Sequence, residues 1–147
     1  MTLFEAPVYD PARERRRKFT IAAVIILVVA IACVAYVLRN WPEEQVVRHF
    51  FNALQSQQYE KAYGIWVADP NWKEHPQKYE RYTYNEFYHR DWGPGGDYGL
   101  IKSFHIDGSG RPKGGSGVIV QVTINGRAEP ARIWVEKSDK SLTFSPF

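Results

Sequence analysis

The longest hydrophobic run in the chain covers residues 19–38, where twenty consecutive positions carry no charged side chain. A helix rises about 1.5 Å per residue, so this run would be about 30 Å long, which is the thickness of the hydrocarbon core of a bilayer. Its many Val and Ile residues are mediocre helix formers in water, but within lipid only a helix satisfies the backbone of a single segment. The pattern therefore predicts a transmembrane helix over residues 19–38.

The charges on the two sides of this run differ. Five basic residues lie between positions 13 and 18, whereas on the carboxyl side only Arg39 is near. By the positive-inside bias, residues 1–18 form a basic cytoplasmic tail and residues 42–147 an extracytoplasmic domain. Phe19, Tyr36 and Trp41 fall near the expected boundaries of the membrane, where aromatic rings gather. We expect a single-pass protein of the bacterial inner (cytoplasmic) membrane with its amino terminus inside and a periplasmic domain.

Two other interpretations of the run account for less of it. A cleavable signal peptide also begins with basic residues, but its apolar core is usually shorter, and a small-x-small exit followed by polar residues is missing here. Residues 30–33 read Ala-Ile-Ala-Cys and loosely resemble a bacterial lipobox, in which the cysteine would be lipidated. Five more apolar residues follow Cys33, and lipidation would leave them unexplained. Cys33 is more simply a small, polarisable residue within a helix.

After residue 41 the hydrophobic period becomes that of two amphipathic helices. Pro42 suits a first helical turn, and Glu43 and Glu44 suit the positive end of the helix dipole. Apolar residues then recur at spacings of three and four, first over residues 47–54 and again over residues 59–66. The first face comprises Val47, Phe50, Phe51 and Leu54, and the second comprises Tyr59, Ala62, Tyr63 and Trp66.

The next segment is expected to be less regular. Residues 68–82 read as a loop with at most one helical turn. Thr83 and Glu86 have the spacing of a capping box, so a short third helix should follow, with Phe87 and Tyr88 facing inward. Residues 93–96, Gly-Pro-Gly-Gly, end it.

In the remainder of the chain, apolar and polar residues alternate with a period of two. We expect strands over residues 101–106, 118–124, 131–137 and 142–145. Asn125-Gly126 indicates a two-residue hairpin, and the glycine-rich residues 108–117 join the first two strands as a loop. Helices followed by a run of antiparallel strands predict an α+β domain, with the helices on one face of a curved sheet.

The net positive charge of the chain comes from its amino-terminal part. The net charge is +3, but residues 42–147 carry thirteen Lys or Arg and thirteen Asp or Glu. The basic run before the hydrophobic segment suits anionic lipid headgroups, and the neutral outer domain has no electrostatic footprint for nucleic acid. The single cysteine lies in the hydrophobic run, so the outer domain has no disulfide.

Two runs of residues in the predicted helices resemble the opening of the nuclear transport factor 2-like superfamily, a cone-shaped α+β fold shared with ketosteroid isomerase. The runs are Pro42-Glu43-Glu44-Gln45-Val46-Val47-Arg48-His49-Phe50-Phe51-Asn52-Ala53-Leu54 and Gln58-Tyr59-Glu60-Lys61-Ala62-Tyr63. The Glu86-Phe87 helix, the Asn-Gly hairpin and the Trp134 strand fit the same plan over residues 42–147. The turn between the helices, usually marked by an acidic or glycine step, is Ser56-Gln57-Gln58 here. The chain looks like membrane-anchored bacterial members, and such a resemblance implies a fold far more than an activity.

The resemblance would place a carboxylate base within the cone, and no residue can be assigned to that role. Four aspartates fall in predicted loops or helix ends, and no predicted strand carries an inward acid; they are Asp69, Asp91, Asp97 and Asp107. The four histidines lack an i, i+4 pair or a companion cysteine, so we expect no metal site; they are His49, His75, His89 and His105. Residues 108–117 lack the Gly-Lys-Ser/Thr ending of a phosphate loop. We expect neither a catalytic site nor a cofactor.

Aromatic side chains are more numerous than one small core requires, above all over residues 66–98. Trp and Tyr combine apolar area with a polar group, so some of them should form a ligand or partner surface. The candidates are Trp66, Trp72, Tyr84, Phe87, Tyr88, Trp92 and Trp134. The alternative is that these rings close the open end of the cone on themselves.

These patterns predict a non-catalytic accessory or assembly subunit that contacts membrane lipid and other membrane-protein subunits, and no nucleic acid. Small residues on the span, at which a neighbouring helix could approach closely, are Ala22, Ala23, Ala30 and Ala32. One alternative function is the binding of a small apolar ligand in the cone. A less favoured alternative is an isomerase- or hydrolase-type enzyme.

Overall fold

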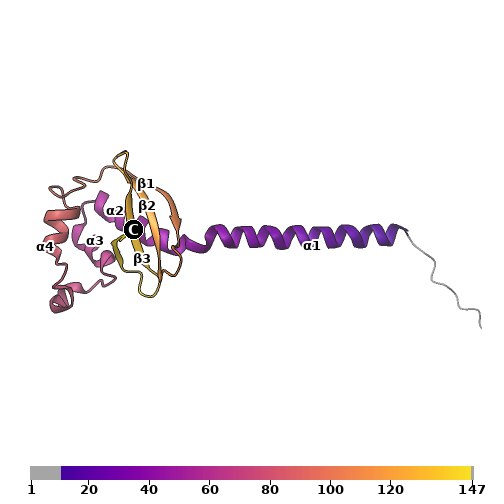
Figure 1. Cartoon of the computed structure of the whole chain (residues 1–147), viewed down its shortest axis with the longest axis horizontal. Helices are drawn as coiled ribbons and strands as arrows, with labels where there is room; N and C mark the ends of the chain where they lie inside the picture. Colours follow the sequence, from indigo (N-terminus) through magenta and orange to yellow (C-terminus); the bar gives the residue numbers. More distant parts are fainter. Residues whose placement is uncertain (1–10, 147) are drawn as a thin grey trace, which may run out of the picture. The chain divides into compact units, whose positions relative to one another are not determined.

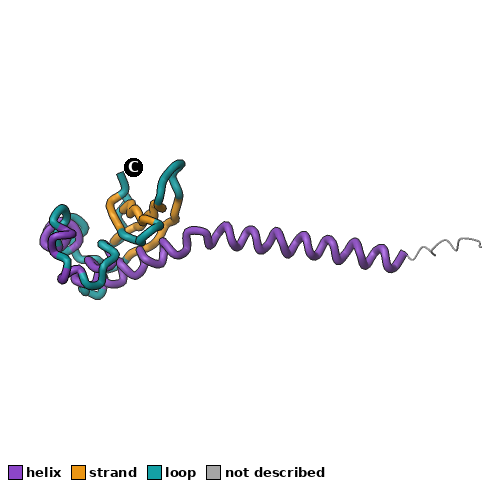
Figure 2. The backbone as a smooth tube through the Cα atoms, turned by 90° about the horizontal axis from the view of Figure 1, so that it is seen from below, coloured by secondary structure: helices purple, strands orange, loops and turns teal. Residues whose placement is uncertain are grey.

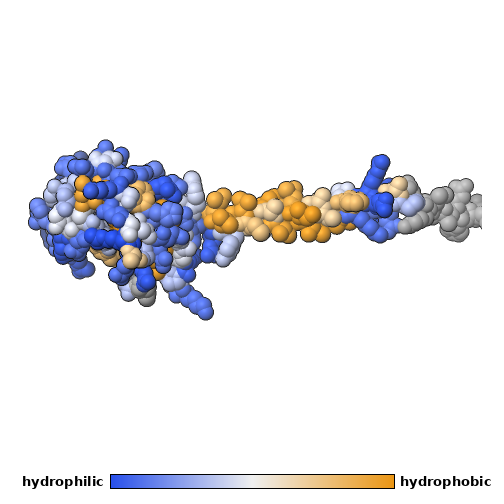
Figure 3. Space-filling model, turned by 90° about the horizontal axis from the view of Figure 1, so that it is seen from above, coloured by the Kyte–Doolittle hydropathy of each residue, from blue (hydrophilic) through white to orange (hydrophobic). Residues whose placement is uncertain are grey.

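A computed structural model describes residues 11–146, which divide into two compact units that meet between Arg39 and Asn40 (Figure 1). The first unit contains helix α1, Pro11–Val37, and the short 3-10 turn η1, Leu38–Asn40, follows it. The helix is long and apolar enough to cross a membrane. Most of its visible side in Figure 3 is apolar, and its amino-terminal end is polar. The predicted irregular tail before Pro11 lies outside the described residues.

The second unit begins with the two helices that the sequence predicts. They are α2, Trp41–Gln55, and α3, Tyr59–Trp66. All four residues of the first predicted face are fully buried, and in α3 only Tyr59 of the second face stays half-exposed. The two apolar faces are therefore confirmed.

Residues 68–92 are more regular than a loop. Two 3-10 turns, η2 (Trp72–Glu74) and η3 (Pro76–Tyr79), occupy the segment for which we expected at most one helical turn. The capping box is confirmed, because Thr83 Oγ1 accepts from Glu86 N at 3.3 Å and Glu86 Oε2 accepts from Thr83 N at 2.9 Å. It opens α4, Tyr84–Glu86, which continues as the π-helical turn η4, Phe87–Trp92.

Four antiparallel strands then follow in the order β1-β2-β3-β4. Their bounds are β1 Phe104–Gly110, β2 Gly117–Ile124, β3 Ala131–Glu136 and β4 Leu142–Phe144. The first strand was predicted too early in the chain. It begins three residues later because Asn125 Oδ1 accepts from the N–H groups of Lys102 and Ser103, so these two N–H groups do not enter the ladder. Ser103 O still accepts from Asn125 N at 2.9 Å. It also runs, past an irregularity at Asp107, into the predicted glycine-rich loop.

The Asn-Gly turn forms, but it does not make the predicted two-residue hairpin. Asn125 and Gly126 both have positive φ (51° and 68°), and Arg127 N donates to Ile124 O at 2.9 Å. Pairing between β2 and β3 starts only at Val122 and Ala131. The end of β2 instead pairs with β1, so a longer loop joins β2 to β3.

The core lies between the helices and one face of the sheet. The helical segments of this unit lie to one side of the strands (Figure 2), and α2 contacts β1, β2 and β3. The burial of alternate residues in β2 and β3 shows that only one sheet face is covered. The unit is therefore α+β with an antiparallel sheet. The largest fully buried side chains include Trp92, Tyr63, Phe50, Phe51, Phe87 and Leu54.

A long-range ion pair joins the first turn of α2 to the turn before β4. Lys140 Nζ lies 2.7 Å from Glu43 Oε1, and the Glu43 side chain is only 4% exposed. Burial alone would raise the pKa of Glu43, but the hydrogen bond and charge of Lys140 lower it below its ordinary value of 4.5. Removing the cation would leave a buried carboxylate without its partner, which is costly.

We predict that Lys140→Met destabilises the unit by about 1–2 kcal/mol, less than the loss from a fully buried pair, because solvent reaches Lys140. Methionine keeps the side-chain length and the same left-handed backbone position, so the comparison isolates the charge. Urea unfolding of the full chain in detergent, followed by tryptophan fluorescence, measures the loss. The pKa of Glu43 is lower in the folded state than in the unfolded state, so its ion pair stabilises the fold fully above about pH 4.5. The difference in stability between the two chains should be lost as the pH falls below that value and through the folded-state pKa. An equal loss for the exposed Lys113→Met would contradict the prediction.

Candidate functional site

Three of the seven predicted surface aromatics lie in the core. Trp66 is 4% exposed, and Phe87 and Trp92 are fully buried. Their rings pack around Phe50, with centroid separations of 5.2 Å, 6.1 Å and 5.1 Å. A partner cannot reach Phe87 or Trp92, and Trp66 exposes very little, so the expectation that these three residues form a contact surface is wrong.

The same rings pack against further aromatic side chains in the core. Phe51 packs edge-on against Phe50 at 5.2 Å and against Trp92 at 5.6 Å. Tyr63 extends the cluster to Phe87 at 5.3 Å, and its hydroxyl donates to Tyr82 O at 2.6 Å. These rings therefore form part of the buried core.

Three other predicted residues come together at the surface. Trp72 stacks on Tyr84 at 5.1 Å, and Tyr84 stacks on Tyr88 at 6.0 Å. Tyr59 continues the row, because its ring packs edge-on against Tyr88 at 5.0 Å. All four side chains are half-exposed. We call Tyr59, Trp72, Tyr84 and Tyr88 the aromatic ridge.

Local structure explains how the ridge forms. The capping box fixes the turn that carries Tyr84, and the π-helical turn η4 places Tyr88 beside it while Phe87 points into the core. Single-turn π segments are frequent at functional sites. Tyr59 was missed because its helical spacing assigned it to the buried stripe of α3. That spacing gives no sign that the first turn of α3 extends past the core.

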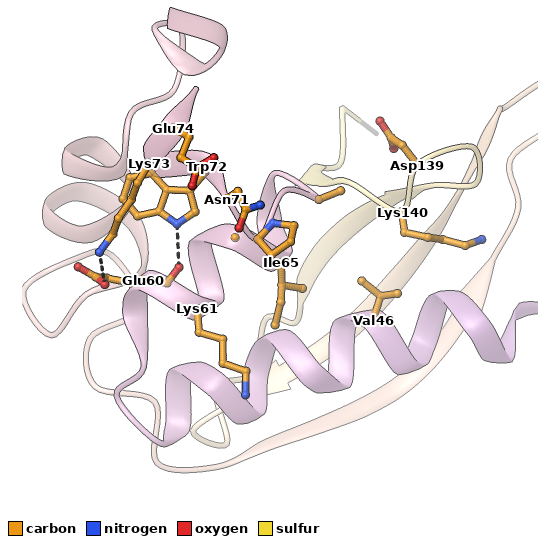
Figure 4. Close-up of a pocket in the computed structure, with 13 residues that line it drawn as sticks. Val46, Glu60, Lys61, Ile65, Asn71, Trp72, Lys73, Glu74, Asp139 and Lys140 are labelled. Atoms are coloured by element: carbon orange, nitrogen blue, oxygen red, sulfur yellow. Dashed lines mark hydrogen bonds and ion pairs between the residues drawn. The ribbon is translucent and has the colours of Figure 1, made fainter. Parts of the chain in front are cut away.

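A groove with a volume of about 780 Å³ adjoins the ridge at Trp72 (Figure 4). Val46 from α2 and Ile65 from α3 supply apolar side chains, and Lys140 lies at the end away from Trp72. A hydrogen bond to α3 holds the Trp72 side chain, because its Nε1 donates to Glu60 O at 3.2 Å. Both signs of charge line the groove, so its electrostatics select neither an anion nor a cation. The charged residues are Glu60, Lys61, Lys73, Glu74, Asp139 and Lys140.

A carboxylate holds the segment that carries Trp72. Asp69 Oδ2 accepts from the Tyr79 hydroxyl at 2.7 Å and lies 2.9 Å from His75 Nδ1, while Oδ1 accepts from Asn71 N at 2.9 Å. The hydrogen bond from Tyr79 is the main reason why the pKa of Asp69 is lowered. Gly64 gives this segment room, because a Cβ there would lie 3.2 Å from Asp69 O. Asp69 therefore organises residues 69–79 against α3.

Asp91 is the buried carboxylate nearest the aromatic core, at 6% exposure. It accepts from the Tyr82 hydroxyl at 2.6 Å and from Arg90 Nε at 3.1 Å. Burial raises the pKa of Tyr82, and the hydrogen bond to Asp91 raises it further, so the hydroxyl stays protonated and donating. With two donors already bound, Asp91 joins residues 79–82 to the π-helical turn.

Trp134 lies apart from the ridge. It belongs to the sheet face opposite the helices, where it is half-buried, and its Nε1 donates to Glu136 Oε2 at 3.4 Å. A Cβ at Gly117 would lie 2.6 Å from the Trp134 ring, so the glycine allows the indole to lie flat on β2. This packing accounts for Trp134 without a ligand.

The four alanines of α1 do not form one stripe. At about 100° per residue, Ala22, Ala23 and Ala30 share one side of the helix, whereas Ala32 lies about 200° from Ala30. Close approach of a neighbouring helix would therefore use the first three. Ala32 would contribute to a different face.

Among residues 11–146, no three His, Cys, Asp or Glu side chains gather in a way that could hold a metal ion. Comparisons of the chain with protein-family models, with curated proteins and with solved structures found no match. The function is therefore inferred from the side chains of this chain alone.

We predict that Asp69→Asn loosens the segment that supports Trp72. The amide keeps the shape of the side chain but weakens its charge-assisted bonds to Tyr79 and Asn71. Amide hydrogen exchange in residues 70–79 of the full chain should become several times faster, because this segment opens locally more often. The sheet should exchange as before. Asp97→Asn, on an exposed side chain, is the control, and an equal change in that variant would refute the role of Asp69.

Proposed function

We propose that this chain is a single-pass membrane protein whose extracytoplasmic domain acts by protein contact, as a non-catalytic accessory or assembly subunit. The aromatic ridge is the observation that carries the proposal. It gathers half-exposed rings on a compact unit whose interior is already filled. Tyr and Trp side chains are enriched at the centres of protein interfaces, because they bury large areas with few rotatable bonds.

The membrane assignment is supported by α1. None of its residues is buried against the rest of the protein, although residues 19–38 are apolar throughout. The basic residues before position 19 favour an inside amino terminus and contact with anionic lipid.

The nuclear transport factor 2-like assignment is supported by the order of elements. A helix pair, a short capped helix and an antiparallel meander follow one another, with the helices on one face of the sheet. The filled interior favours contact at the surface over an apolar ligand inside the cone. The two buried carboxylates also favour a structural role over catalysis, because Asp91 and Glu43 are each held by a cation within the unit.

The topology has a direct test. A protease added to spheroplasts should digest residues 42–147 and spare residues 1–18, because the positive-inside bias places the basic tail in the cytoplasm. Antibodies against tags at the two ends would follow each part on immunoblots. Digestion of the tail with protection of the domain would reverse the assigned orientation. Release of the intact domain without protease would show a cleaved signal.

The contact surface is tested on the ridge. Full chain purified in mild detergent should bring down a larger assembly, and Tyr84→Lys with Tyr88→Lys should lower its recovery about tenfold or more, as expected for loss of an aromatic anchor. Mass measurement of the purified complex gives the readout. His105→Lys with Gln121→Lys adds the same charge at exposed sheet positions and should leave recovery unchanged. A wild-type chain that purifies as a clean monomer would contradict the proposed function.

A further inference from the structure

The strand β4 has one open edge. Within residues 11–146 it pairs only with β3, through Leu142, Thr143 and Phe144, and it is last in the sheet order. Ser141 O accepts from Glu136 N, and Ser145 N donates to Arg132 O, so these flanking residues turn toward β3. Because backbone direction alternates along an antiparallel strand, the N–H and C=O groups of Leu142 and Phe144 point to the open side.

An apolar groove of about 360 Å³ runs beside this edge. Residues 141–144 line it together with Trp66, Val67, Lys78, Tyr79, Arg81 and Tyr82. Phe144 is 40% exposed, although its ring packs on Trp66 at 5.0 Å and on Trp92 at 5.6 Å. Edge strands are usually protected by shortness, by charge or by cover. β4 has only three residues, yet its edge presents an exposed ring next to an apolar groove.

The charged side chains that line the groove are both cations, Lys78 and Arg81, and both are exposed. Glu80 lies between these cations in the chain and is exposed, but it does not line the groove. Three other carboxylates nearby have partners. Asp69 accepts from Tyr79, Asp91 accepts from Tyr82 and Arg90, and Asp139 Oδ1 accepts from Ser141. The groove therefore presents a positive rim over an apolar floor.

We propose that β4 and this groove bind an extended acidic segment of a partner protein, which adds to the sheet as a fifth strand. The proposal rests on the proposed contact function and names the chemistry of the partner. The outward backbone groups of Leu142 and Phe144 hold the segment by strand addition. Alternate apolar side chains of the segment enter the groove, and its carboxylates meet Lys78 and Arg81. A second copy of this chain fits poorly, because pairing of two such edges would bring the same cations together.

The test uses the full chain in lipid nanodiscs and three fluorescein-labelled peptides, read by fluorescence polarisation. The first peptide alternates Glu with Val and Phe, the second replaces each Glu by Lys, and the third is the acidic peptide with alternate backbone nitrogens methylated. The acidic peptide should bind about tenfold or more tightly than the other two, and its binding should weaken with salt. Equal binding of the acidic and Lys peptides, or no binding of the acidic one, would overturn the proposal.

The site is located by charge reversal. Lys78→Glu with Arg81→Glu should weaken binding of the acidic peptide about tenfold or more and strengthen binding of the Lys peptide. Lys102→Glu with Lys113→Glu, at two exposed cations that do not line the groove, should change neither. Thr143→Cys in a Cys33→Ala chain tests the second copy, because disulfide-linked dimers at β4 would show that the edge pairs with itself. Such dimers would also overturn the proposal.

The proposed strand addition at β4 and the proposed contact function can be refuted independently. If the Lys78→Glu, Arg81→Glu chain still brings down the assembly in full amount, the edge is not the docking site and the contact function stands. If the wild-type chain purifies alone, the contact function fails whatever peptide binds at β4.

Discussion

The α+β unit depends on the packing of aromatic rings around Phe50. This side chain lies in edge-on or tilted contact with Phe51, Trp66, Phe87 and Trp92, which come from three helical segments. Truncation of one buried Phe typically costs about 3–5 kcal/mol, against a total stability of about 5–15 kcal/mol for a domain. The cluster therefore holds these helical segments together, and Phe51 and Trp92 connect it to the sheet through Phe104 and Phe144. Its rings belong to the buried core.

Local patterns in the sequence predicted the parts of the fold that local forces decide. The faces of α2 and α3 follow from helical spacing, and the Thr83–Glu86 capping box is a contact within one turn. Long-range contacts decided the rest. Asn125 binds the backbone at Leu100, Lys102 and Ser103, more than twenty residues away, and this shifts the start of β1. No short window of sequence contains that information.

The candidate site shows the same division. The sequence has more aromatic residues than one small core requires, but their spacing does not show which rings are buried in the core. Phe87 and Tyr88 are neighbours in the chain, yet the first is fully buried and the second joins the ridge, because the π-helical turn points them in different directions. Trp134 goes to the opposite sheet face because its strand alternates. The surplus therefore divides into a core cluster, a ridge and one residue on the outer sheet face.

The ridge and the β4 groove share a support in residues 69–82. Asp69 ties Tyr79, which lines the groove, to the segment that carries Trp72, while Asp91 binds Tyr82 on the groove wall. Hydroxyl–carboxylate bonds of this kind hold short 3-10 turns that have little helical stability of their own. The two carboxylates therefore position side chains of both surfaces, because the ridge at Trp72 and the groove lining at Tyr79 and Tyr82 depend on the same short segment.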